Sequence, residues 1–214
     1  YVFETHFHAD FVSGHIELAR LTNAIIVFGP KAVTSYECIF ANHNQEFQFG
    51  TMRLRALHTP GHTLESTCYL LISSSNQHEA VFTGDTLFIG EVGRPDLAVN
   101  PQLKSGDLAN QLYDSLHNVI MKIADDVIVY PGHGAGSACG KNISSQKQST
   151  IGEQKKSNYA LQPMTKKEFT KMVLKGMSSP PQYFSHDVAM NKEGYQPIVK
   201  VLEKSANKLS YETA

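Results

Sequence analysis

The alternation of hydrophobic and polar positions predicts several strands, most clearly over residues 52–57. There Met52, Leu54 and Ala56 alternate with two arginines, which is the pattern of a strand with one buried face. Five shorter runs also predict strands, and three of them, 25–28, 80–83 and 127–130, are followed directly by Gly or Pro. They lie at residues 1–5, 25–28, 67–72, 80–83 and 127–130.

Helical spacing is longest over residues 108–123, where Leu, Val and Ile recur every three or four positions. A second helix is predicted over residues 12–22, with Asp10 or Ser13 as its N-terminal cap. Residues 166–176 are the clearest helix in the polar C-terminal part. Strands and helices mixed in this order predict an α/β layered fold.

The composition favours a globular protein of one domain and argues against a nucleic-acid-binding or membrane protein. A chain of 214 residues with 41% hydrophobic side chains fits one domain, or one domain with a tail. A formal net charge of -1 gives no bulk attraction to nucleic acid or to an anionic membrane. No apolar run approaches the roughly 18 residues that a spanning helix needs. Three scattered cysteines favour reduced thiols, and hence a cytoplasmic location.

The most informative segment for chemistry is residues 4–11, with the sequence ETHFHADF. Side chains two positions apart on an extended segment point to the same side, so His6, His8 and Asp10 can face one point. Imidazole and carboxylate groups are ligands for zinc and iron. A run of this kind normally continues to a further histidine, whose place is taken here by Phe11, which cannot bind a metal.

Three later breaks after predicted strands carry the same chemistry. Each places glycine directly before a histidine or an aspartate, which permits unusual backbone angles and close approach to an ion. They are Gly61–His62, Gly84–Asp85 and Gly132–His133. Any one of these histidines could be an ordinary cap or surface residue. Together with the first motif, however, they predict a metal site.

The series resembles the metallo-β-lactamase fold superfamily over about residues 3–141. Four motifs resemble its persulfide dioxygenase branch, in particular the bacterial enzymes fused to rhodanese modules. They are ETHFHADF at residues 4–11, HTPGHT at 58–63, GRPDL at 93–97 and PGHGAGSACGK at 131–141. The resemblance implies an αββα sandwich that lacks its first N-terminal strands. Residues 1–190 would form the N-terminally truncated catalytic domain, and residues 191–214 a tail or linker towards a rhodanese module.

The resemblance also implies a function, an Fe(II)-dependent persulfide dioxygenase of sulfide detoxification. Such an enzyme oxidises a low-molecular-weight thiol persulfide, such as glutathione persulfide, with O2 to sulfite and free thiol. One iron would be held by His6, His62 and Asp85, although zinc shares these ligand types. Three further residues would orient the ligands or a bound water: His8, Asp10 and His133. The implied partners are the persulfide, O2 and a rhodanese domain in cis, with a homo-oligomer left open.

Two residues of these motifs have catalytic and structural alternatives. Cys139 lies in a glycine-rich loop near Lys141, where a cation or the metal would lower its pKa, so it could meet the substrate sulfur or carry sulfane sulfur. The alternative is a small loop residue without chemistry. Arg94 could bind an anionic substrate group or sulfite, or it could form an ion pair with Asp96.

Two rival functions follow from the same residues. A glyoxalase II-type hydrolase would cleave thioesters with metal-bound hydroxide, but it needs a metal pair, against which Phe11 argues. A non-catalytic module that carries metal or sulfur through Cys139 is the second rival.

Overall fold

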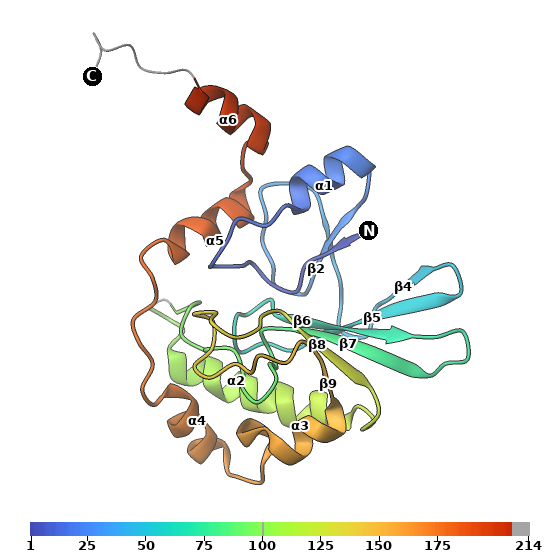
Figure 1. The fold of residues 1–214 in the computed structure, drawn as a ribbon, viewed down its shortest axis with the longest axis vertical. Helices are drawn as coiled ribbons and strands as arrows, with labels where there is room; N and C mark the ends of the chain where they lie inside the picture. The colour runs from blue at the N-terminus through green and yellow to red at the C-terminus, as the bar shows by residue number, and fades with distance from the viewer. Residues whose placement is uncertain (100, 207–214) are drawn as a thin grey trace.

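The computed structural model describes residues 1–99 and 101–206, which form two β-sheets packed face to face with helices outside them (Figure 1). The smaller sheet is parallel and has the order β1-β2-β3, with strands Val2–Phe3, Ile26–Phe28 and Ile39–Phe40. The sheets and the outer helices give the four αββα layers that the resemblance implies.

The larger sheet has the order β4-β5-β6-β7-β8-β9. Its strands are Glu46–Phe49, Met52–His58, Thr67–Ile72, His78–Gly84, Ile128–Pro131 and Ser149–Thr150. All its pairs are antiparallel except β7 with β8. Because β7 and β8 are parallel, their carboxyl ends, Gly84 and Pro131, meet at one edge of the sheet. This edge delivers Asp85 and His133 to the same place.

The helices are α1 His15–Thr22, α2 Ser105–Asn118, α3 Ile151–Ser157, α4 Lys166–Leu174, α5 Phe184–Glu193 and α6 Ile198–Ala206, with 3-10 turns at Ile120–Lys122 and Tyr159–Leu161. Helices α1 and α5 pack on the small sheet and α2, α3 and α4 on the large sheet, whereas α6 projects away from both sheets (Figure 1). In the part of the chain that the structure describes, none of them is long and apolar enough to cross a membrane.

Three of the four apolar clusters in the described part of the chain hold these layers together. The largest joins the outer face of the large sheet to α2, α3 and α4, with Leu112, Val129 and Phe169 fully buried. A second cluster, around Tyr69, fills the space between the sheets. The third packs the small sheet, through Phe28, against α1 and α5. Burial of this apolar area is the main stabilising contribution to the fold.

The strands predicted from the sequence are confirmed, and all three predicted helices have different ends. Helix α4 ends at Leu174, two residues before the predicted end. Helix α1 begins only at His15, with Gly14 as its N-cap, because the Ser13 hydroxyl donates instead to the buried Glu4 carboxylate. Neither Asp10 nor Ser13 caps this helix, so that prediction was wrong. Helix α2 ends at Asn118, and the apolar spacing beyond it belongs to the 3-10 turn.

Candidate metal centre

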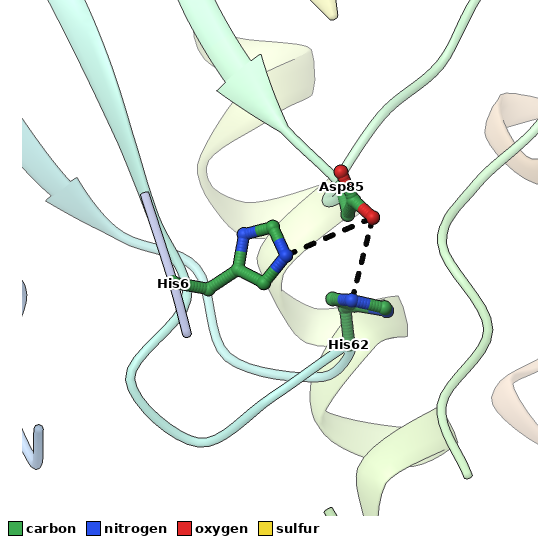
Figure 2. A group of neighbouring side chains, drawn as sticks. All are labelled: His6, His62 and Asp85. Carbon is green, nitrogen blue, oxygen red and sulfur yellow. Dashed lines mark ion pairs between the residues drawn. The ribbon is translucent and has the colours of Figure 1, made fainter. Parts of the chain in front are cut away.

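The sheet edge brings together three side chains from distant parts of the chain, His6, His62 and Asp85 (Figure 2). One ligand atom from each lies within 4.8 Å of the others. The His6 Nε2 and His62 Nε2 atoms lie 3.8 Å and 3.4 Å from Asp85 Oδ2. All three side chains are buried. The two imidazoles point at one carboxylate, as the resemblance implies for a shared ion.

A second group adjoins the first and contains the other three predicted residues, His8, Asp10 and His133. The His133 Nε2 atom lies 3.5 Å from Asp10 Oδ2 and 3.4 Å from Asp85 Oδ2, so His133 lies between the two groups. All six residues that the sequence singled out for the metal site are therefore neighbours.

Polar atoms left without hydrogen bonds indicate that these groups fit a cation. Within the described residues, the buried atoms His6 Nε2, His133 Nε2 and both Asp85 carboxylate oxygens make no hydrogen bond. Buried polar groups are nearly always paired, because desolvation without a partner is costly. Imidazole nitrogens and a carboxylate that converge without partners are the donor set of a zinc or iron site.

The protonation states of Asp85, His6 and His8 also suit metal binding. Burial alone would raise the pKa of Asp85, but His6, His133 and His62 hold it well below its usual range, so the group is an anion. Burial lowers the pKa of His6 and of His8, which keeps both imidazoles neutral. A neutral imidazole and an ionised carboxylate are the forms that bind a metal.

Backbone geometry explains why glycine precedes the aspartate and His133. Gly84 has a φ of +50°, in the left-handed region that other residues rarely adopt. Gly132 lies against the Asp85 carboxylate, and a Cβ atom there would meet Asp85 Oδ1 at 2.5 Å. A side chain at Gly132 would therefore displace the central carboxylate.

The orientation of His62 is set by the loop that carries Arg94. The His62 Nδ1 atom lies 2.8 Å from the Arg94 carbonyl oxygen, which can only accept, so Nδ1 carries the proton. This leaves Nε2 free to face Asp85. A second hydrogen bond of this kind is typical of histidines that bind metals.

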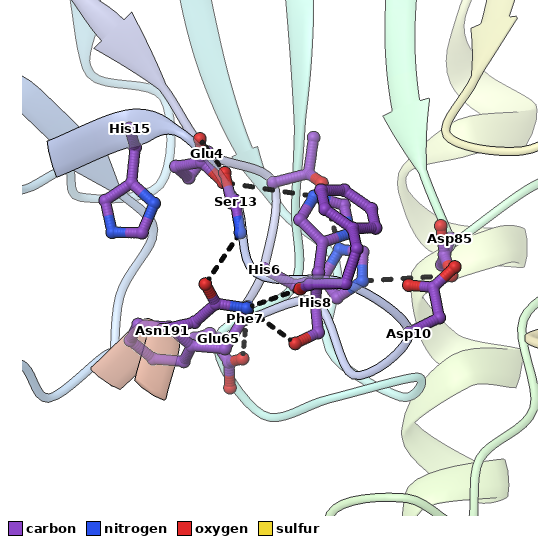
Figure 3. A network of polar contacts seen from close by, with 12 residues as sticks. Glu4, His6, Phe7, His8, Asp10, Ser13, His15, Glu65, Asp85 and Asn191 are labelled. Carbon is purple, nitrogen blue, oxygen red and sulfur yellow. Dashed lines mark hydrogen bonds and ion pairs between the residues drawn. The ribbon is translucent and has the colours of Figure 1, made fainter. Parts of the chain in front are cut away.

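A network of buried polar groups connects the loop of residues 8–13 to helix α5 (Figure 3). Asn191 of α5 donates from Nδ2 to the carbonyl oxygens of His8 and Phe11, both at 2.9 Å. Its Oδ1 accepts from the Ser13 N–H, also at 2.9 Å. Asn191 is only 1% exposed. The first histidine motif thus depends on a residue that no sequence motif marks. Helix α5 continues to Glu193, past residue 191, where the tail was expected to begin.

Little in the sequence indicates this network. Glu4 and Ser13 lie within or beside the first histidine motif, but only the structure shows that they are hydrogen-bonded. Asn191 belongs to no motif. Tyr195 completes the network, because its hydroxyl donates to the Ser13 carbonyl oxygen.

Arg94 forms the ion pair that the sequence left as one alternative. Its guanidinium donates to both Asp96 carboxylate oxygens, at 2.7 Å and 2.8 Å, and also to the carbonyl oxygens of Ala138 and Ser178. The side chain is 5% exposed. The guanidinium is therefore already engaged by groups of the chain itself.

Cys139 lies beside the metal centre, but its thiol is not activated in the way that the sequence suggested. Its Sγ atom groups with Asp85 and His133, and the residue is 1% exposed. Burial, followed by the charges of Asp85 and Asp10, raises its pKa, whereas a lowered value was expected. The expected cation, Lys141, instead donates to carbonyl oxygens at the end of α4.

The solved structures that resemble this chain extend over most of it. A metallo-beta-lactamase from Staphylococcus aureus has a TM-score of 0.82 and 32% identity, covering 91% of this chain and 59% of its own. ETHE1 from Myxococcus xanthus has a TM-score of 0.74 and 30% identity, covering 89% and 75%. No family model matches the chain.

Curated relatives have hydrolase names. The probable hydroxyacylglutathione hydrolase glo2 of Schizosaccharomyces pombe is 35% identical over 134 residues, which are 62% of this chain and 47% of that protein. The probable zinc-dependent hydrolase PksB of Bacillus subtilis is 30% identical over 69% of this chain and 62% of its own length. The chain spans about half the length of the hydroxyacylglutathione hydrolases that it matches.

Proposed function

This chain belongs to the metallo-β-lactamase fold superfamily, and on that premise we propose that it is an Fe(II)-dependent persulfide dioxygenase. It would oxidise a low-molecular-weight thiol persulfide with O2 to sulfite and the free thiol. The curated hydroxyacylglutathione hydrolases are about twice as long as the segment that they share with this chain, and the activity is proposed on the metal centre and the aromatic residue beside it.

The observation that carries the proposal is the aromatic side chain at Phe11. A histidine there would add a donor beside His8, but the phenyl ring stacks on the His8 imidazole, with 4.3 Å between the ring centroids. The group of His6, His62 and Asp85 keeps three donors and needs nothing from residue 11. Two histidines and one carboxylate around a single ion are the ligand set of non-heme iron oxygenases.

In this proposal His6, His62 and Asp85 hold the iron, which supplies the reactivity toward dioxygen when bound. The other residues orient and shield the reaction. The Arg94 carbonyl oxygen fixes the ring of His62, and Asn191 holds the loop that carries His8 and Asp10. The rings of Phe11 and Phe88 lie against the imidazoles of His8 and His133 as apolar walls of the site.

A thioester hydrolase is the second candidate, and the names of the curated relatives favour it over the oxygenase. One structural observation supports it as well. His8, Asp10 and His133 also offer three donors within 4.8 Å of one another, which is a place for a second ion. Two ions would suit the generation of a hydroxide nucleophile.

Metal analysis of anaerobically purified protein, combined with two activity assays, separates these candidates. The oxygenase predicts one iron per chain and oxygen consumption that depends on glutathione persulfide. The hydrolase predicts two metal ions per chain and cleavage of the lactoyl thioester of glutathione. Thioester cleavage without persulfide-dependent oxygen consumption would overturn the proposal in favour of the hydrolase.

A further inference from the structure

A cavity of about 330 Å³ borders the metal centre through His62. Five segments of the chain meet around it: the first histidine loop, the turn after β2, residues 62–65, residues 97–99 and helix α5. Its apolar lining includes Phe7, Val33, Leu97, Val99 and Val188. A cavity of this size fits a small organic molecule. The body of a substrate that reacts at the metal could therefore extend into it.

The charges around this cavity are mostly positive. Lys31 and Lys192 both line it, against one carboxylate, that of Glu65. In the described part of the chain, neither lysine ammonium is within ion-pair distance of a carboxylate. The Glu65 carboxylate accepts instead from the Phe7 N–H, at 3.1 Å. The cavity thus offers two ammonium groups whose charge is not neutralised by a bonded partner.

The two lysines have different settings at the cavity. The Lys192 Nζ atom lies 5.2 Å from the centroid of the Phe7 ring, which forms part of the lining. Lys31 follows Pro30 with a φ of 66°, a left-handed conformation in which glycine or asparagine is favoured. A long, charged side chain at such a position carries a conformational cost, which is a feature of binding sites.

We propose that this cavity, through Lys31 and Lys192, binds the carboxylate groups of the low-molecular-weight thiol that carries the sulfur to the metal. The inference rests on the proposed function, and it selects carboxylate-bearing thiols over neutral ones. The apolar lining receives the body of the molecule, and the ammonium groups pair with its carboxylates.

Binding of S-methylglutathione, an unreactive dicarboxylate thioether, tests the site without any turnover. Isothermal titration calorimetry should show binding to the wild type, weakened about tenfold or more in Lys192→Met, because one charge-assisted contact is lost. Lys31→Asn should weaken it similarly while suiting the left-handed backbone. Lys167→Met, at an exposed lysine away from the cavity, is the matched control and should bind as the wild type does. No binding to the wild type, or equal binding to both cavity variants, would overturn the inference.

Turnover separates this inference from the proposed function. In the cavity variants KM for glutathione persulfide should rise about tenfold with kcat unchanged, whereas the neutral persulfide of 2-mercaptoethanol should react equally with all forms. If the wild type consumes no oxygen with either persulfide, the proposed function fails. The binding experiment then still decides whether the cavity takes carboxylates. If the wild type is active and its KM for glutathione persulfide equals that of the cavity variants, the inference about the cavity is refuted and the proposed function stands.

Discussion

The phenyl ring of Phe11 stacks on the imidazole of His8, with 4.3 Å between the ring centroids and 28° between the ring planes. Phe11 is 43% exposed and lines a second cavity of about 460 Å³, together with other aromatic side chains. An apolar ring therefore occupies the space beside His8 that a further nitrogen ligand would need.

This contact predicts the outcome of Phe11→His. The new imidazole would add a donor next to His8, Asp10 and His133, so the metal content should rise from one to two ions per chain. Persulfide-dependent oxygen consumption should fall in parallel. Inductively coupled plasma mass spectrometry of the purified variant measures the first effect. Phe11→Leu, which adds no donor, is the control, and an unchanged metal content in Phe11→His would contradict the role given to this residue.

Removal of a proposed ligand should remove the metal. Asp85→Ala and His62→Ala each leave two of the three donors, so we expect bound iron to fall below detection after anaerobic purification. His78→Ala, at an exposed position on β7, should retain the full metal content. Full iron content in the Asp85 variant would show that the ligand assignment is wrong.

Asn191→Ala should remove the hydrogen bonds that attach the loop of residues 8–13 to helix α5. The change leaves the His8 and Phe11 carbonyl oxygens and the Ser13 N–H without their partner, and we expect it to lower the free energy of unfolding by about 3 kcal/mol. Iron affinity, measured by competition with a chelator, should fall about tenfold. Asn110→Ala removes an exposed side-chain hydrogen bond on α2 and should change neither quantity. Iron affinity equal to that of the wild type would exclude a positioning role for Asn191.

Arg94→Ala should act mainly on stability. The guanidinium bonds Asp96 and two carbonyl oxygens, so its loss leaves buried groups unpaired at a cost of about 3 kcal/mol in chemical denaturation. A substrate-binding role would instead raise KM at unchanged stability. Asp96→Asn provides the partner variant for a double-mutant cycle, in which a coupling energy near zero would contradict the ion-pair role.

His15 predicts a pH dependence of stability. Burial lowers its pKa from 6.5 to about 4, so between these values the unfolded state binds more protons and stability rises with pH. The contribution of this one group is at most about 1.4 kcal/mol per pH unit. Glu4, whose pKa burial raises to about 7, acts with the opposite sign. The difference between His15→Gln and the wild type therefore isolates the effect.

In urea denaturation from pH 4 to 6.5, stability should rise less steeply with pH in His15→Gln than in the wild type. His78→Gln, at an exposed histidine, should follow the wild type. Parallel curves for His15→Gln and the wild type would show that His15 does not titrate as its burial requires.

The sequence predicted six of the nine described strands and the six polar residues near their ends, because both depend on local patterns. Alternation marks β5, and glycine before Asp85 and His133 marks loops with special backbone geometry. The grouping of these residues follows from the parallel pairing of β7 and β8, since both chain segments end at the same edge.

What the sequence did not predict depends on tertiary partners. Ser13 carries a capping residue type, but Glu4 competes for its hydroxyl once both are buried. The pKa of Cys139 is governed by burial, which no local pattern reveals, because the neighbouring Lys141 turns toward α4. Strands β3, β4 and β9, which the sequence did not predict, have two, four and two residues, too few for periodicity to be decisive.

The hydrogen bond from Asn191 to the His8 carbonyl joins residues 183 positions apart. During synthesis the histidine loop therefore leaves the ribosome well before the helix that secures it. Closing so long a loop is entropically costly and slow, so the iron-loading form should mature last. Proteolytic cleavage between α4 and α5 would free the helix that holds the histidine loop. It should therefore release a bound metal before the large sheet unfolds.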